Sequence, residues 1–190
     1  MPVNIVRTII NNSIDKKDSS QERWAFFVYG EEDFMFKILA LDQASKTTGW
    51  AIATRKGVKK SGLIKVDPDL PYLERLRLMR EQIQELIWKT NPSYVVFEDI
   101  QYQRNASAFQ ILGMLQGIII AELFDNNLDF FIVPSVTWKS YCGIKGKNRM
   151  VQKENSIKYV LEKYGREVTD DEADAIGIAD WALANVEEDK

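Results

Sequence analysis

Four acidic residues are placed where carboxylates could hold metal ions: Asp42, Glu98, Asp171 and Asp174. The first two end short apolar runs, 38–41 and 94–97, that are typical of buried strands. A carboxylate in such a run is costly to bury in its ionised form unless a partner cancels its charge. The last two lie three residues apart at the start of an apolar helical stretch, so one helix face presents both. The pattern predicts a site for divalent cations.

Oxygen atoms have to be the metal ligands, because the chain contains no histidine and a single cysteine, Cys142. This composition excludes an intrachain disulfide, a zinc cluster and a Ser-His-Asp triad. Carboxylate and water oxygens suit Mg²⁺ or Mn²⁺. Two such ions, about 4 Å apart, support phosphodiester hydrolysis, because one lowers the pKa of a water and the other stabilises the leaving oxygen.

The length and composition indicate one main domain, since 190 residues with 45% hydrophobic content are ordinary for a single fold. The longest unbroken apolar runs, such as 117–121 and 130–133, are far shorter than the roughly 20 residues of a spanning helix. The N-terminus shows no signal-peptide pattern. We therefore expect a cytoplasmic protein that does not associate with a membrane.

Charge is segregated along the chain although the net charge is only −3. Between Thr137 and Arg166 there are eight basic residues and two acidic ones, whereas from Glu167 to Lys190 there are nine acidic residues and one lysine. The basic segment is a candidate phosphate-contacting surface. A solvated surface of mixed charge is the alternative, and it explains single lysines as well as DNA contact does.

The periodicity predicts an α/β fold in which helices flank a mixed, five-stranded sheet. Three strands in a meander come first, and a helix that ends before Asn91-Pro92 follows them. Two more strands then alternate with helices, and two helices complete the domain. The expected strands are 36–41, 50–54, 59–66, 94–97 and 129–133, and the expected helices are 73–87, 106–124, 150–164 and 170–185.

Residues 1–34 differ in character from the rest and are expected to be an N-terminal extension of unknown role. Their polar stretches predict an appendage or a partly disordered leader, because Met35 runs directly into the first strand. A packed extra strand over 24–29 is the alternative. The nuclease domain is accordingly expected to cover 35–190.

Three motifs in order, at 41–51, 96–98 and 171–179, resemble the RuvC-type Holliday junction resolvase family. The likeness extends over about residues 36–183 and looks most like a bacteriophage version. It implies a ribonuclease-H-like fold, a homodimer, and Mg²⁺-dependent paired nicks in four-way DNA junctions. The resemblance assigns the role of catalytic metal ligands to the four acids. It also implies a dimer-forming helix near 106–123.

The same resemblance predicts a DNA-contacting set that follows the second acid and fills the basic segment. Its members are Tyr102, Arg104, Asn105, Ser107, Lys139, Lys145, Lys147, Arg149 and Lys153. Two departures from the family pattern affect cleavage-sequence preference more than metal chemistry. Gln43-Ala44 replaces the usual glycine after the first acid. Ile100-Gln101-Tyr102 stands where the family has an aromatic residue used at the junction centre, a role that Tyr102 could take.

Each acid also has an alternative interpretation. Asp171 and Asp174 could simply complement the dipole of their helix, although we expect Asp170 to have that role. Asp42 could be an Asx-turn residue. Asp99 would replace Glu98 if the strand were shifted by one residue, although alternation favours Glu98.

The sequence therefore predicts a structure-selective, Mg²⁺-dependent endodeoxyribonuclease that binds branched DNA and resolves Holliday junctions. For a phage-encoded protein it would act in the host cytoplasm. A non-catalytic junction-binding module is the first alternative, and the retention of four acids argues against it. An ATPase domain of the actin or sugar-kinase type is the second, but those enzymes need two such domains. A general branched-DNA nuclease remains open within the predicted class.

Overall fold

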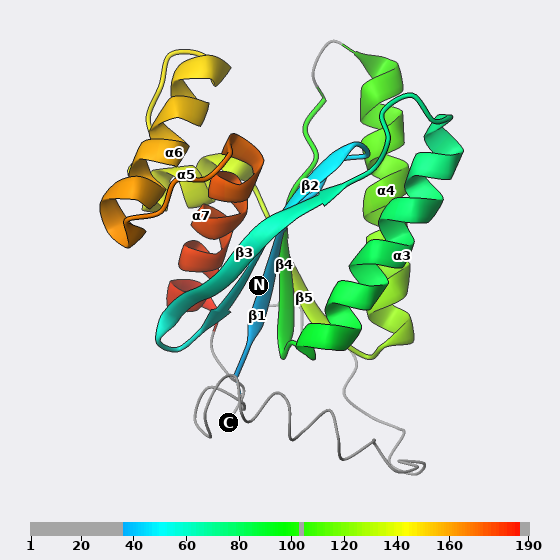
Figure 1. Cartoon of the computed structure of the whole chain (residues 1–190), viewed down its shortest axis with the longest axis horizontal. Helices are drawn as coiled ribbons and strands as arrows, with labels where there is room; N and C mark the ends of the chain where they lie inside the picture. The colour runs from blue at the N-terminus through cyan, green and yellow to red at the C-terminus, as the bar shows by residue number, and fades with distance from the viewer. Residues whose placement is uncertain (1–35, 103–104, 187–190) are drawn as a thin grey trace, which may run out of the picture.

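The computed structural model of the chain describes residues 36–102 and 105–186. Its centre is one five-stranded mixed sheet with the strand order β3-β2-β1-β4-β5 (Figure 1). The strands are β1 (Ile38–Asp42), β2 (Thr47–Thr54), β3 (Gly57–Lys65), β4 (Tyr94–Glu98) and β5 (Asp129–Val133). The predicted α/β fold with five strands is confirmed. The predicted extension over 1–34 lies outside the described residues.

The strand register brings two of the acids to the same edge of the sheet. Strand β1 runs antiparallel to β2 and parallel to β4, and Leu41 pairs with Phe97. The carboxyl ends of parallel neighbours lie at one edge. The next residues along each chain segment, Asp42 and Glu98, therefore end adjacent strands side by side.

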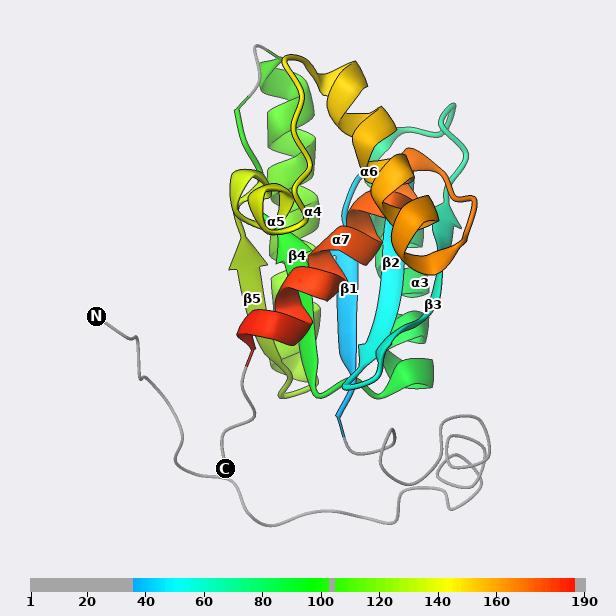
Figure 2. The ribbon, with the colours of Figure 1, turned by 90° about the vertical axis from the view of Figure 1, so that its left-hand side faces the viewer.

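Helices cover both faces of the sheet (Figures 1 and 2). One face carries α3 (Tyr72–Thr90) and α4 (Ala106–Asp125), and the other carries α7 (Asp170–Asn185). Helices α5 (Ser135–Tyr141) and α6 (Arg149–Tyr164) lie on the α7 side, beyond the sheet. Each face of the sheet has its own hydrophobic core. Alternate residues of β1 pack into one core or the other, because successive side chains of a strand point to opposite faces.

Helix α5 was not expected from the sequence. It has seven residues and begins directly after Pro134, so it is too short for apolar periodicity to reveal. Its one buried residue is Trp138, which is fully enclosed. The element order differs from the prediction only by this helix.

Helix α4 is apolar enough in length and composition to cross a membrane, although only 28% of the window that meets this criterion is buried. The short apolar runs did not indicate this, because Gln116 and Glu122 interrupt the stretch. Leu115, Ile119 and Leu123 pack in the core of the α3/α4 face. The buried Glu122 is paired with Arg80 of α3 at 3.1 Å, which ties the two helices together.

Candidate active site

The four acids line one cavity at the edge of the sheet where β1 and β4 end. The cavity has a volume of about 600 Å³, and Asp42, Glu98, Asp171 and Asp174 all contribute to its lining. Strands β1 and β4 supply the first two acids, and the first turns of α7 supply the others. The structure thus brings together residues that are up to 132 positions apart in the sequence, counted from Asp42 to Asp174.

A glycine allows α7 to approach the sheet this closely. Gly49 of β2 pairs with Asp42 in the ladder and lies against the first turn of α7. A Cβ atom at Gly49 would lie 1.9 Å from the backbone oxygen of Asp171, which is less than any van der Waals contact. The short side chains of Asp171 and Asp174 reach the cavity because nothing separates their helix from the strand.

Burial and mutual repulsion make the cavity unfavourable for carboxylates that lack a cation. Burial raises the pKa of Asp42 well above its ordinary value, and the carboxylates of Asp174, Glu98 and Asp171 raise it further. Burial is also the main cause that raises the pKa of each of the other three acids. Nearby donors oppose this effect, since Lys139 lowers the pKa of Glu98 and the Ser156 hydroxyl lowers that of Asp174.

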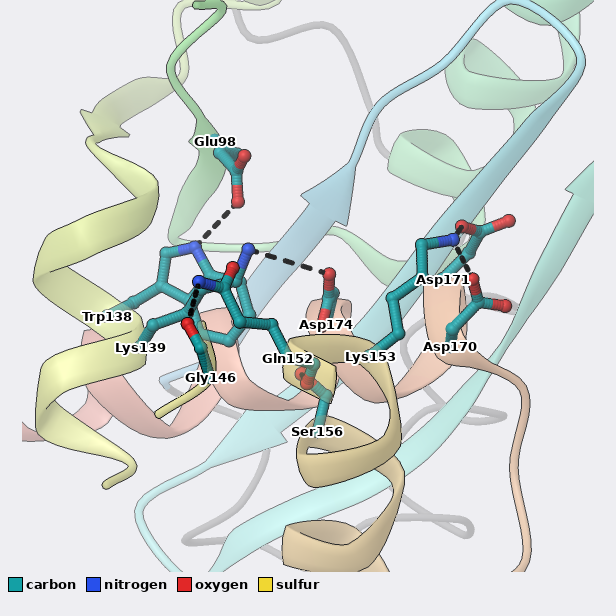
Figure 3. Close-up of polar contacts among 10 residues, drawn as sticks. All are labelled: Glu98, Trp138, Lys139, Gly146, Gln152, Lys153, Ser156, Asp170, Asp171 and Asp174. Atoms are coloured by element: carbon teal, nitrogen blue, oxygen red, sulfur yellow. Dashed lines mark hydrogen bonds and ion pairs between the residues drawn. The ribbon is translucent and has the colours of Figure 1, made fainter. Parts of the chain in front are cut away.

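The donor set fits a hard divalent cation. Asp174 Oδ1 is buried and has no hydrogen-bond partner, which leaves one carboxylate oxygen unsatisfied inside the site. Within 36–102 and 105–186, no three acidic side chains already converge as a preformed metal cluster. Lysine ammonium groups lie among the acids instead (Figure 3): Lys139 Nζ is 4.0 Å from Asp174 Oδ2, and Lys153 Nζ is 4.0 Å from Asp171 Oδ1 and also contacts Asp170.

The predicted DNA-contacting residues divide into two groups. Asn105, Lys139, Arg149 and Lys153 line the cavity, and the Asn105 side chain also caps α4 by accepting a hydrogen bond from the Ala108 N–H. The second group is exposed and outside the lining, and its members are Tyr102, Ser107, Lys145 and Lys147. Arg104 is outside the described residues. Tyr102 is 65% exposed and packs edge-on against Phe109.

Three acids adjacent in sequence to the four candidates, Asp99, Asp170 and Glu172, have different surroundings. Asp99 is exposed at the rim of the cavity. Asp170 is the acid of the first α7 turn whose pKa is lowered, chiefly by its hydrogen bond from Lys153. Glu172 points to β3, where its Oε1 accepts a hydrogen bond from the Ser61 hydroxyl at 2.7 Å.

Sequence reasoning missed several polar residues of the cavity. Gln43, Asn148 and Gln152 belong to its lining. The Gln43 amide donates to the backbone oxygen of Glu98 at 2.5 Å, so it ties the ends of β1 and β4 together. Its position next to the first acid was the available signal. The contact of Trp138 with the second acid was also missed: its indole N–H donates to Glu98 Oε2.

An acid-lined cavity at the end of a mixed sheet of this topology defines a ribonuclease-H-like nuclease domain. Comparison with known families agrees: the family described as "Crossover junction endodeoxyribonuclease RuvC" matches residues 38–180. The chain belongs to the RuvC family of endonucleases. The resemblance to this family is thereby confirmed, and the likeness to a bacteriophage version stays a prediction.

Curated relatives carry the same description. The RuvC protein of Ralstonia nicotianae is 28% identical over 147 residues, which cover 75% of this chain and 81% of that protein. The RuvC protein of Borrelia turicatae is 27% identical over 131 residues, with 67% and 79% covered.

Solved structures share the fold. RuvC of Thermus thermophilus in complex with a Holliday junction substrate superposes with a TM-score of 0.64 at 15% identity, covering 78% of this chain and 95% of that one. The yeast mitochondrial Holliday junction resolvase Ydc2 superposes with a TM-score of 0.55 at 16% identity, covering 88% and 85%.

Proposed function

We propose that this protein is a divalent-metal-dependent endonuclease that resolves four-way DNA junctions by paired nicks. The observation that carries the proposal is a single cavity whose lining contains all four acids together with three basic side chains. Membership of the RuvC family supports the endonuclease class. The Thermus thermophilus neighbour was solved with a Holliday junction, which supports branched DNA as the ligand.

The residues of the cavity have separable roles in this proposal. Asp42, Glu98, Asp171 and Asp174 would hold Mg²⁺, for which Mn²⁺ would substitute, as two ions that supply an activated water and stabilise the leaving oxygen. Lys139, Arg149 and Lys153 line the same cavity and would bind the oxygens of the scissile phosphate. Asn105 at the start of α4 presents a side-chain amide to the same cavity.

The exposed basic residues extend the binding surface beyond the cavity. Lys145 and Lys147 lie between α5 and α6 and are exposed. They would contact phosphates away from the cut, where each contact adds affinity that falls with salt. Tyr102 has the exposed ring that a base at the junction centre could stack on.

A second copy of the chain fits the exposed side of α4. Exposed residues recur there at three- and four-residue spacing, namely Gln110, Met114, Gly117, Ala121 and Phe124. A two-fold pairing of these helices would present two active sites to opposite strands, as paired nicks require. Ala121→Arg places a charge in this stripe and should convert the dimer to a monomer in analytical ultracentrifugation. Glu85→Arg on the exposed side of α3 should leave the dimer intact.

The deciding experiment is cleavage of four-way, three-way, flap and linear DNA in Mg²⁺. Paired nicks confined to four-way DNA would support a resolvase, whereas cutting of every branched form would support a general branched-DNA nuclease. Asp42→Asn and Glu98→Gln should abolish cutting and leave junction binding largely intact, because phosphate contacts supply most of the affinity. Asp129→Asn, at an exposed carboxylate outside the cavity lining, is the matched control.

Two results would contradict the proposal. Junction binding by the wild type without metal-dependent cutting would favour a non-catalytic junction-binding module. Cutting that survives Glu98→Gln but is lost in Asp99→Asn would mean that the neighbouring, rim-located carboxylate is the functional one.

A further inference from the structure

We propose that Trp138 is a positioning residue that fixes the orientation of the Glu98 carboxylate in the metal-binding cavity. This inference rests on the proposed function, because it takes Glu98 to be a metal ligand. Trp138 belongs to the short helix α5, which the sequence did not predict. The next residue, Lys139, lines the cavity.

The hydrogen bond between the two side chains is the first observation. The Trp138 Nε1–H donates to Glu98 Oε2 at 2.8 Å (Figure 3). An indole has one donor and no acceptor, so the bond engages one carboxylate oxygen and leaves the other for a different ligand. Trp138 is fully buried, so its ring has little freedom to turn away.

The packing of the indole is the second observation. A Cβ atom at Gly177 of α7 would lie 2.6 Å from Trp138 Cζ3 and 2.9 Å from Cε3. The glycine therefore makes room for the ring on the helix that carries Asp171 and Asp174. Trp138 contacts an acid of β4 at one end and this helix at the other, so it sets the two sources of ligands relative to each other.

The backbone of the same region holds α5 in place. The Asp99 N–H donates to the Val133 oxygen at 2.8 Å, which joins the ends of β4 and β5 just before α5 begins. Lys139, next in sequence, has its ammonium 4.0 Å from Asp174 Oδ2. Two consecutive residues of α5 thus contact acids from two different elements.

A purely structural role is the competing explanation, because a buried indole N–H needs some acceptor. In that case loss of the donor would lower stability and leave metal affinity unchanged. In the proposed role, loss of the donor weakens metal binding through Glu98. Partners of metal ligands typically change affinity by roughly 10–100-fold when they are removed.

The test is direct Mn²⁺ binding, followed by electron paramagnetic resonance, in the full chain with Trp138→Phe. Phenylalanine keeps an aromatic ring and removes the donor. We expect Mn²⁺ to bind roughly 10–100-fold more weakly, while junction binding without metal stays within about twofold of wild type. Trp181→Phe, on α7 and outside the cavity lining, is the matched control and should bind Mn²⁺ as the wild type does.

A double-mutant cycle separates positioning from general destabilisation. Glu98→Gln removes the carboxylate that Trp138 orients, so adding Trp138→Phe to this variant should cause little further loss of Mn²⁺ affinity. Equal losses in both backgrounds, or wild-type Mn²⁺ affinity in Trp138→Phe, would overturn the inference. If the wild type cuts junctions and Trp138→Phe binds Mn²⁺ normally, only this inference fails. If the wild type shows no metal-dependent cutting, the proposed function fails, and this inference fails because it rests on that function.

A measurement on the unaltered tryptophan covers the case in which Trp138→Phe does not fold. In ¹⁵N-labelled protein, the indole N–H resonance that moves on Glu98→Gln should also move when Mg²⁺ is added to the wild type. An indole resonance that responds to Glu98→Gln but not to Mg²⁺ would overturn the inference.

Discussion

The two faces of the sheet are packed in different ways. The face under α3 and α4 is filled by large aliphatic side chains such as Met79, Ile83 and Leu115. The buried cluster under α7 contains seven alanines among its eighteen residues, Ala40, Ala51 and Ala175 among them, whereas the other cluster contains none. Small residues let a helix approach a sheet closely, and the acids of the cavity come from the α7 side. The comparison separates a face that stabilises the fold from a face that positions the site.

The α7 side also contains a buried polar network that involves α6. Asp180 of α7 is buried and accepts hydrogen bonds from the Tyr159 hydroxyl at 2.7 Å and the Tyr164 hydroxyl at 2.5 Å. Lys163 completes the group with an ion pair at 2.9 Å to Asp180. Because these partners come from α6, the network fixes the helix that carries Lys153 to the helix that carries Asp171. The direction of hydrogen bonds adds an orientation that aliphatic packing alone would not impose.

The largest expected effect on stability is on the aliphatic face. Ile83 of α3 is 1% exposed, so Ile83→Ala should lower the free energy of unfolding by about 2–5 kcal/mol. The cleavage rate of the folded protein should stay near that of the wild type, because α3 lines no part of the cavity. Chemical denaturation and cleavage at low temperature measure the two quantities. The exposed Glu85→Ala is the control, and a large loss of cleavage in folded Ile83→Ala would contradict the division between faces.

The converse experiment is on the small-residue face. Gly49→Ala places a methyl group against the Asp171 backbone and should displace the first turn of α7. A displacement of about 1 Å at a reacting centre can cost roughly 100-fold in rate, so we expect at least that loss of Mg²⁺-dependent cutting. Circular dichroism should still show a folded protein, and junction binding without metal should persist. Wild-type cleavage by Gly49→Ala would show that α7 need not lie against β2.

Burial of Asp42, together with repulsion from the neighbouring acids, predicts a pH dependence of stability. Since the pKa of Asp42 is raised in the folded state, its ionisation opposes folding at all pH values above the raised pKa. That cost decreases as the pH falls through the raised pKa and disappears below the ordinary value of 3.8. Asp42→Asn removes the cost, so the metal-free variant should unfold at a higher temperature than the wild type near pH 7. The difference should shrink toward about pH 4.

Metal ions should reverse this order of stability. Mg²⁺ that binds only the folded state raises the unfolding temperature of the wild type, and more so than that of Asp42→Asn. Calorimetry in chelator and in Mg²⁺ compares the two proteins. A metal-free wild type that is more stable than Asp42→Asn at neutral pH would contradict the electrostatic description of the cavity.

Apolar runs and periodicity predicted the regular strands and helices. They missed the features that depend on a single contact. The strands β1, β4 and β5 and the helix over 170–185 followed from apolar runs and periodicity, and the resemblance singled out the acids that the structure brings together. The helix α5 was missed because seven residues are too few to show a period. The tasks of Gln43 and Trp138 were missed because each depends on a partner about 40 to 55 residues away in sequence.

The smallest expected effect concerns the first turn of α7. The Ser61 hydroxyl on β3 donates to Glu172 in the first turn of α7 at 2.7 Å, outside the cavity lining. A single hydrogen bond of this kind contributes about 0.5–1.5 kcal/mol, so Ser61→Ala and Glu172→Ala should each lower stability by that order. Denaturation of both variants and of the double variant gives their coupling, which should be of similar size. Because Gly49, rather than this bond, lets the acids reach the cavity, cutting should change less than about threefold. A much larger loss would mean that the polar contact with β3 also holds Asp171 in position.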